Sequence, residues 1–207
     1  MTNTDALALV SAWQRFSAWL AAHSPADHAA LRPPADAGRI AHLEEGLGFA
    51  LHPQLRALLE LHDGVAQPPD GEMYPPGSFL PLGHRLIPTE HILTRHREFA
   101  EVLPPETFGP ESWRHLVSHA HWWVPIALPN DGGLLLVDHL PGPVYGHVYE
   151  MGLGSGDADG SLWATSLADM FTALTDSLTT GRQFHHFAPD THRHAPGHHR
   201  IDWQVVL

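Results

Sequence analysis

Helical hydrophobic patterns dominate the first third of the chain. Between Thr4 and Ala22, apolar residues recur every three or four positions, which predicts an amphipathic helix with Thr4 as its N-cap. A second helix is predicted over residues 35–47, with Gly48 as its C-terminal cap. A third helix begins at Pro53 and closes at His62-Asp63-Gly64, where Asp-Gly is a turn signal.

The centre of the chain combines strand and helix signals. Apolar residues on consecutive positions in Leu134–Val137 are typical of a strand that is covered on both faces. The remaining predictions are strands over 79–82, 122–128, 134–138 and 144–151, and helices over 88–103 and from the N-cap Ser166 to about Thr180, ended by Gly181.

Histidine, proline and glycine mark the last 26 residues as different from the rest. Residues 182–200 carry many histidines, which predicts a loop or a partly disordered segment. Residues 201–207 are more apolar and predict a short strand that could extend a sheet at its edge.

Composition narrows the function classes. The formal net charge of −12 argues against a nucleic-acid-binding face, which needs clustered Lys and Arg, and favours a basic partner. The chain has no Cys, which excludes disulfides, thiolate zinc sites and cysteine nucleophiles. The first residues lack a secretory pattern and no apolar run is long enough to span a bilayer, so the cytoplasm is the expected compartment and no membrane partner is expected.

Two sets of short motifs then occur in a familiar order. The first is Pro33-Pro34-Ala35, Leu43-Glu44, Leu47-Gly48, Leu58-Leu59 and Asp63-Gly64; the second is Trp123-Val124-Pro125-Ile126-Ala127, Asp131-Gly132-Gly133 and Val137-Asp138. In order and spacing, the chain resembles the SUKH superfamily, the Smi/Knr-type domain of bacterial immunity proteins and fungal cell-wall regulators.

The resemblance implies an α+β fold with a single, mostly antiparallel twisted sheet and helices packed around it. The resemblance covers about residues 5–181, so residues 1–181 are predicted to form one domain, followed by a His-rich tail over 182–207. It also implies a non-catalytic protein-binding domain that neutralises a cognate toxin, often a nuclease, by stoichiometric binding. A regulatory scaffold of the cell-wall-regulator type is the first alternative. No catalytic residue and no cofactor are carried over.

Five residues are candidate partner contacts: Glu44, Glu45, Asp63, Trp123 and Asp131. Each has a plainer alternative. The glutamates are also what a solvated helix face contains, the two aspartates suit turns, and one of the adjacent tryptophans Trp122 and Trp123 must point into the core because strand side chains alternate. Trp at an interface is often a binding hot spot.

The histidines offer a third function, a metal-dependent enzyme. Spacings such as His192-x-His194 are usable for a metal, but a site needs fixed ligands, which a Pro/Gly-rich tail provides poorly. We therefore predict no metal site. The loop around Gly152–Gly156 matches neither nucleotide-binding glycine motif.

Overall fold

The computed structural model describes residues 2–67, 75–102, 119–129, 133–152, 161–195 and 198–206. Its helices are α1 (Thr2–His23), α2 (Pro25–Ala29), α3 (Ala37–Leu47), α4 (Pro53–Leu61), α5 (Thr89–Val102) and α7 (Leu167–Thr180), with 3-10 turns at Pro81–Gly83 and Ala120–Trp122. Its strands are β1 (Arg85–Leu86), β2 (Trp123–Leu128), β3 (Leu134–Asp138), β4 (Val148–Met151), β5 (Ser161–Ala164), β6 (Phe187–Ala195) and β7 (His198–Val205).

Local sequence signals set most of the helix ends. Gly48 and Gly181 both adopt the left-handed conformation, at φ 82° and 73°, and stop α3 and α7 as predicted. The hydroxyl of Ser166 accepts the backbone N–H of Asp169 and caps α7. Pro25 follows α1 but also opens the short helix α2, which the sequence had not indicated, because proline fits the first turn of a helix.

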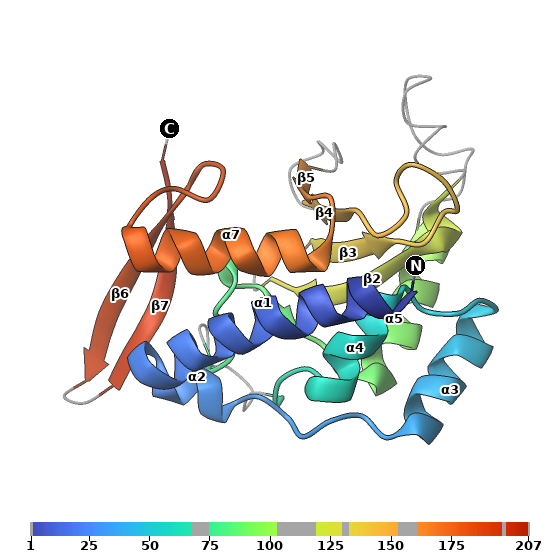
Figure 1. Cartoon of the computed structure of the whole chain (residues 1–207), viewed down its shortest axis with the longest axis horizontal. Helices are drawn as coiled ribbons and strands as arrows, with labels where there is room; N and C mark the ends of the chain where they lie inside the picture. The colour runs from blue at the N-terminus through green and yellow to red at the C-terminus, as the bar shows by residue number, and fades with distance from the viewer. Residues whose placement is uncertain are drawn as a thin grey trace.

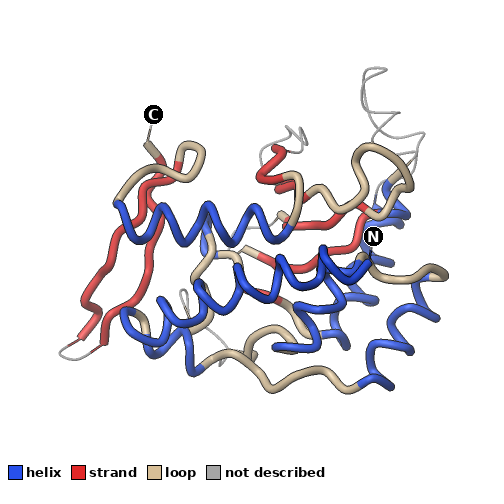
Figure 2. Tube along the Cα trace, in the orientation of Figure 1, coloured by secondary structure: helices blue, strands red, loops and turns tan. Residues whose placement is uncertain are grey.

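The five-stranded sheet has the order β1-β2-β3-β4-β5, and each neighbouring pair is antiparallel. This confirms the predicted α+β class. Figure 2 separates the strands from the helices that surround them. Val124 and Val137 contribute to the large hydrophobic core, whereas Leu134 and Leu136 contribute to a second, smaller one. Because alternate residues of a strand face opposite sides, the sheet is buried on both faces, as the apolar run predicted.

Helices α1 and α7 lie side by side over the sheet, and α5 packs between β2 and α3 (Figure 1). Aromatic side chains of α1 and α7 pack in the large core. The rings of Trp13 and Phe171 meet there edge to face, with their centroids 4.7 Å apart. Helix α3 lies at the opposite end of the molecule from β6 and β7 (Figure 1). Most of its side chains are exposed, and Ile40 and Leu43 are the positions that anchor it.

Two strand predictions in the middle of the chain need correction. The strand expected over Phe79–Leu82 does not form, because Pro81 and the left-handed residues Leu82 and Gly83 turn the chain there. The strand lies instead at Arg85–Leu86. The strand expected from Val144 begins only at Val148, because the left-handed Gly146 closes a turn by donating to the carbonyl of Asp138. The sequence did not indicate β5.

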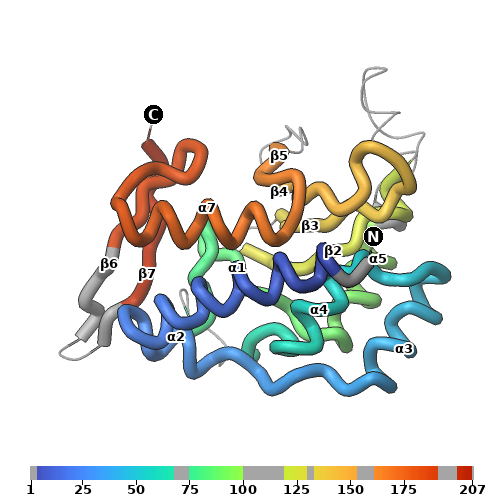
Figure 3. Tube along the Cα trace, viewed as in Figure 1, coloured from blue at the N-terminus to red at the C-terminus, as the bar shows by residue number. Residues whose placement is uncertain are grey.

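The loop predicted over residues 182–200 is also wrong, whereas the strand predicted over 201–207 does form, as part of β7 (His198–Val205). Strands β6 and β7 pair as an antiparallel hairpin that forms a separate two-stranded sheet and does not extend the main one (Figure 3). Phe184, Phe187, Ile201 and Trp203 belong to the large core. The indole N–H of Trp203 donates to the carbonyl of Phe79 at 2.9 Å, so the hairpin is packed onto the rest of the chain. The boundary at residue 181 stays a prediction.

The hairpin is also held by a buried ion pair. Asp27 of α2 is fully buried, and its carboxylate accepts the backbone N–H of Gly77 at 2.8 Å. The Arg200 guanidinium of β7 lies 3.7 Å from the same carboxylate and donates to the carbonyl of Pro75. Three segments that are distant in sequence therefore meet at Asp27.

Candidate partner-binding surface around helix α3

Asp63 joins the end of α4 to the start of α5. Its side chain is buried, and one carboxylate oxygen accepts the backbone N–H of Thr89 at 2.7 Å, which caps the N-terminus of α5. The other oxygen accepts from the Arg39 guanidinium of α3 at 3.1 Å. Gly64 makes this possible, because a Cβ atom at that position would lie 2.6 Å from the backbone of Ile87.

Two arginines and Glu90 complete the network around Asp63. Arg32 donates to Glu90 at 2.9 Å and also lies 3.6 Å from Asp63, and Arg39 lies 3.5 Å from Glu90. The hydrogen bond from Arg32 lowers the pKa of the Glu90 carboxyl, and the same bond raises the pKa of the Arg32 guanidinium. The charges of two arginines are therefore neutralised by two carboxylates, and α3, α4 and α5 are held together.

The adjacent residues Glu44 and Glu45 have different surroundings. Glu44 accepts the backbone N–H of Leu51 at 2.9 Å and forms an ion pair with Arg56, so it ties α3 to the following loop and to α4. Glu45 is exposed and makes no ion pair or side-chain hydrogen bond within the described residues. Of the two, Glu45 is the carboxylate that remains available to another molecule.

A groove of about 440 Å³ runs between α3 and α5. His42 and Leu43 of α3 line one side, and Leu93 and Arg97 of α5 line the other. Gly46 lets the helices approach closely, because a Cβ atom there would lie 2.5 Å from a methyl carbon of Leu93. The groove is open and of mixed charge, which suits contact with a macromolecular surface.

Trp123 does not lie on this surface. It is buried in the smaller core, and its indole N–H donates to Asp138 at 3.1 Å. Burial raises the pKa of the Asp138 carboxyl, although the backbone N–H of Leu140 also donates to it. Its neighbour Trp122 is half-buried against Phe49, with the ring centroids 4.9 Å apart.

The structure therefore brings three of the five candidate contacts together. Glu44, Glu45 and Asp63 all lie on or against α3, whereas Trp123 lies in the smaller core and Asp131 lies outside the described residues. Burial of Asp63 and Trp123 gives both side chains structural contacts inside the chain. Their role in partner contact stays a prediction, and Glu45 is the most accessible of the four candidates that the structure describes.

Sequence reasoning missed a cluster of histidines and aromatic rings next to α3. His139 lies at its centre, with Phe49, His52 and Tyr145 at centroid distances of 5.4, 6.4 and 6.2 Å. Burial lowers the pKa of His139 to about 4, and it also lowers the pKa of His52 and of His96 on α5. These residues come from separate segments of the chain, so no local spacing could have indicated the cluster.

Neither a metal centre nor a membrane span is found in the described parts of the chain. No group of three or more His, Cys, Asp or Glu side chains there is placed to hold an ion. None of the helices there combines the length and the apolar character needed to cross a bilayer.

Fold and surface together define an α+β domain with a five-stranded antiparallel sheet, a separate two-stranded hairpin and a helix-lined open groove. The chain belongs to the SMI1/KNR4 family (SUKH-1), whose family model matches residues 34–173. The match begins before α3 and ends inside α7, so α1 and the tail hairpin lie outside it although both contribute to the same core. Comparison with curated proteins finds no match.

Proposed function

We propose that the chain is a cytoplasmic immunity protein that neutralises a cognate toxin by binding it in a one-to-one complex, without catalysis. Membership of the SMI1/KNR4 family is the observation that carries this proposal. The formal net charge of −12 supports a basic partner, for which a nuclease is the leading candidate.

The proposed contact surface is the outward side of α3 together with the groove between α3 and α5. Two ion pairs fix the position of α3. Arg39 of α3 pairs with Asp63 after α4, and Glu44 of α3 pairs with Arg56 of α4. A helix fixed in this way presents Glu45 and His42 without the entropy loss that ordering a mobile segment would add to binding. Docking of this rigid surface over the toxin's active site would block it.

The test begins with the gene next to this one. A toxin encoded there is purified in an inactive form and mixed with this chain, and light scattering after size exclusion is expected to give a one-to-one complex. Glu45→Arg is expected to slow association by about threefold or more at low ionic strength and to have less effect in high salt, because electrostatic steering acts mainly on the on-rate.

Asp176→Arg is the matched control. Asp176 is also an exposed helical carboxylate without a side-chain partner in the described residues, but it lies on α7 and not on α3. If both reversals slow association equally, net charge and not the α3 surface steers the partner. If the neighbouring gene encodes no toxin and the chain instead binds a cellular protein, the regulatory-scaffold alternative replaces the immunity proposal.

A further inference from the structure

Arg85 is an arginine whose charge has no matching carboxylate among the described residues. It lies on the edge strand β1, opposite Leu128 of β2, and its side chain is partly buried. Its Nε atom is buried without a hydrogen-bond partner, and no described carboxylate forms an ion pair with it. Burial lowers the pKa of the guanidinium, and no acid in the described parts of the chain opposes that effect.

The other partly buried arginines of the described chain are matched. Arg32 meets Asp63 and Glu90, and Arg200 lies beside Asp27. An arginine that is taken out of water without a carboxylate destabilises a fold. In a chain with twice as many acidic as basic residues, such a position calls for a functional explanation.

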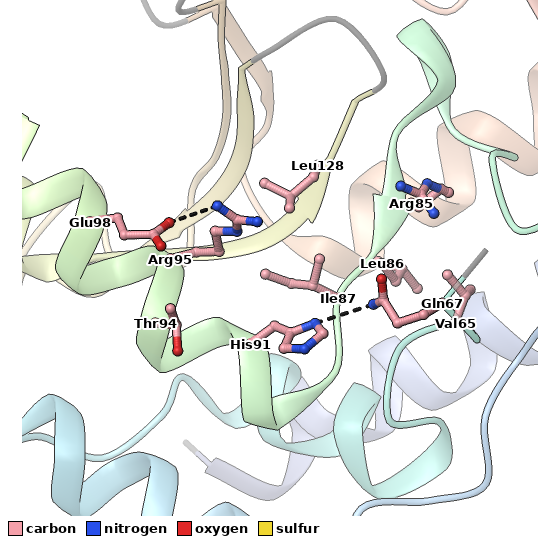
Figure 4. A pocket seen from close by; sticks show the side chains of 10 residues that line it. All are labelled: Val65, Gln67, Arg85, Leu86, Ile87, His91, Thr94, Arg95, Glu98 and Leu128. Atoms are coloured by element: carbon pink, nitrogen blue, oxygen red, sulfur yellow. Dashed lines mark hydrogen bonds and ion pairs between the residues drawn. The ribbon is translucent and has the colours of Figure 1, made fainter. Parts of the chain in front are cut away.

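Arg85 lines a cavity of about 350 Å³ between β1 and α5 (Figure 4). The opposite wall carries His91, Thr94 and Arg95 of α5. Glu98 is the carboxylate in this lining, and it is paired with Arg95 at 2.7 Å. The charge of Arg85 therefore remains as the excess charge of the cavity.

Further donors and an apolar wall accompany that charge. The amide nitrogen of Gln67 donates to Nδ1 of His91 at 3.2 Å, which leaves the proton of a neutral His91 ring on Nε2 as a donor. Leu86, Ile87 and Leu128 supply apolar surface between the polar groups (Figure 4). A cavity of about 150 Å³ holds a benzene ring, so this one has room for a ring and a charged group.

From these observations we propose that the cavity between β1 and α5 binds a carboxylate attached to a small apolar group, with Arg85 as the residue that pairs with it. A planar guanidinium matches a carboxylate through two parallel hydrogen bonds. One excess positive charge suits a monoanion better than a phosphate dianion. The carboxylate can belong to a free organic acid or to a side chain of a bound protein, and the site does not rest on the proposed function.

Benzoate is the probe for the first source, with the full-length protein followed by amide NMR shifts. Saturable shifts at Ile87 and Thr94 are expected, with a dissociation constant on the order of millimolar for so small a ligand. Benzamide, which has the same shape without the charge, is expected not to bind. Equal binding of benzamide or of inorganic phosphate would overturn the assignment to a carboxylate.

Variants locate the site. Arg85→Met is expected to weaken benzoate binding about tenfold or more, and Arg85→Lys, which keeps the charge but not the planar fork, to weaken it less. Arg97→Met is the matched control, because Arg97 is also unpaired among the described residues but is exposed on the α3 side of α5. Circular dichroism checks that each variant is folded. Unchanged binding in both Arg85 variants would overturn the proposal.

A capped tripeptide with one central glutamate tests the second source. Competition with benzoate, at a lower dissociation constant than benzoate itself, would support the carboxylate chemistry and assign it to a protein side chain. Benzoate binding without competition by the peptide would support the same chemistry and assign it to a free acid. Failure of both probes to bind would overturn the site but would leave toxin binding by α3 untouched.

Discussion

Arginines that approach helix α5 from its two sides, Arg32 and Arg39 on one and Arg85 on the other, differ in how their charge is balanced. On the side that faces α3, Arg32 and Arg39 share Asp63 and Glu90 at 2.9–3.6 Å. On the side that faces β1, Arg85 reaches no described carboxylate. On the first side the ion pairs hold α3, α4 and α5 together. On the second side the charge of Arg85 lies in a cavity without a described ion-pair partner.

This difference shows that charge balance in the fold is decided locally. The chain carries 23 acidic and 11 basic residues, so a shortage of acidic residues does not explain why Arg85 has no described partner. The start of α5 receives Asp63 because the turn at Gly64 brings it there, whereas no described segment brings a carboxylate within ion-pair distance of Arg85 on β1. Substitutions that remove one charge at a time test whether the two sides of α5 differ in this way.

Asp63→Ala is expected to have the largest effect, because it removes the group that both arginines and the α5 N-terminus share. Two arginines would lose a buried partner and the N–H of Thr89 would lose its cap, so the free energy of unfolding should fall by about 3 kcal/mol. Urea denaturation measures this. Glu45→Ala, at an exposed position without a partner, should change stability by less than about 0.5 kcal/mol. Equal effects of the two substitutions would contradict the role given to Asp63.

His139, which lies near His96 of α5, makes the stability of the fold depend on pH. The effects of the charged residues on stability should therefore be compared at a pH at which His139 is neutral. The pKa of His139 is about 4 in the folded chain, below the value of about 6.5 for an unfolded histidine. As pH falls below 6.5 the unfolded chain takes up a proton that the folded chain does not. The contribution of His139 to stability is therefore fully present above about pH 6.5, and its loss lowers the free energy of unfolding by about 3 kcal/mol as pH approaches 4.

Denaturation at a series of pH values checks this loss. His139→Phe should flatten the decline, because the ring that resists protonation is gone. His42→Gln, at an exposed position on α3, should leave the decline as it is. A decline that His139→Phe does not alter would assign acid sensitivity to other groups.

The smallest expected effects come from replacing an arginine by methionine on each side of α5. The loss of Arg39 should lower stability, whereas the loss of Arg85 should not. Arg39→Met removes a partner of Asp63 and should lower the free energy of unfolding by about 1 kcal/mol. Arg85→Met removes an unpaired charge that is partly buried and should leave stability unchanged or raise it by up to about 0.5 kcal/mol. Both are measured from urea midpoints, and a loss at Arg85 as large as that at Arg39 would mean that Arg85 has a structural partner.

Sequence reasoning recovered the elements whose signals are local. The ends of α3 and α7 at Gly48 and Gly181, and the strands β2 and β3, follow from capping residues and apolar runs that are visible without any tertiary information. The strand expected at Phe79–Leu82 failed because burial of Phe79 and Leu80 in the core produces the same apolar signal as a strand. The tail hairpin was missed because its apolar anchors Phe187, Ile201 and Trp203 are separated by histidines and polar residues.

The candidate surface was recovered in part, for the same physical reason. Glu45 was found because an exposed carboxylate on a helix can be inferred from helical periodicity alone. Burial of Asp63 under Arg39, and the absence of a described partner for Arg85, depend on which segments meet in space. A single sequence does not show which distant segments contact each other in the fold.

The ion pair between Asp27 and Arg200 bears on where this chain can be shortened. A stretch rich in histidine and proline invites removal as a dispensable appendage. A chain that ended at Gly181 would instead lose Arg200, the ion-pair partner of the fully buried Asp27. It would also lose Trp203, whose indole N–H donates to the carbonyl of Phe79. Anyone who wishes to eliminate the histidines should therefore replace them individually, with the hairpin left in place.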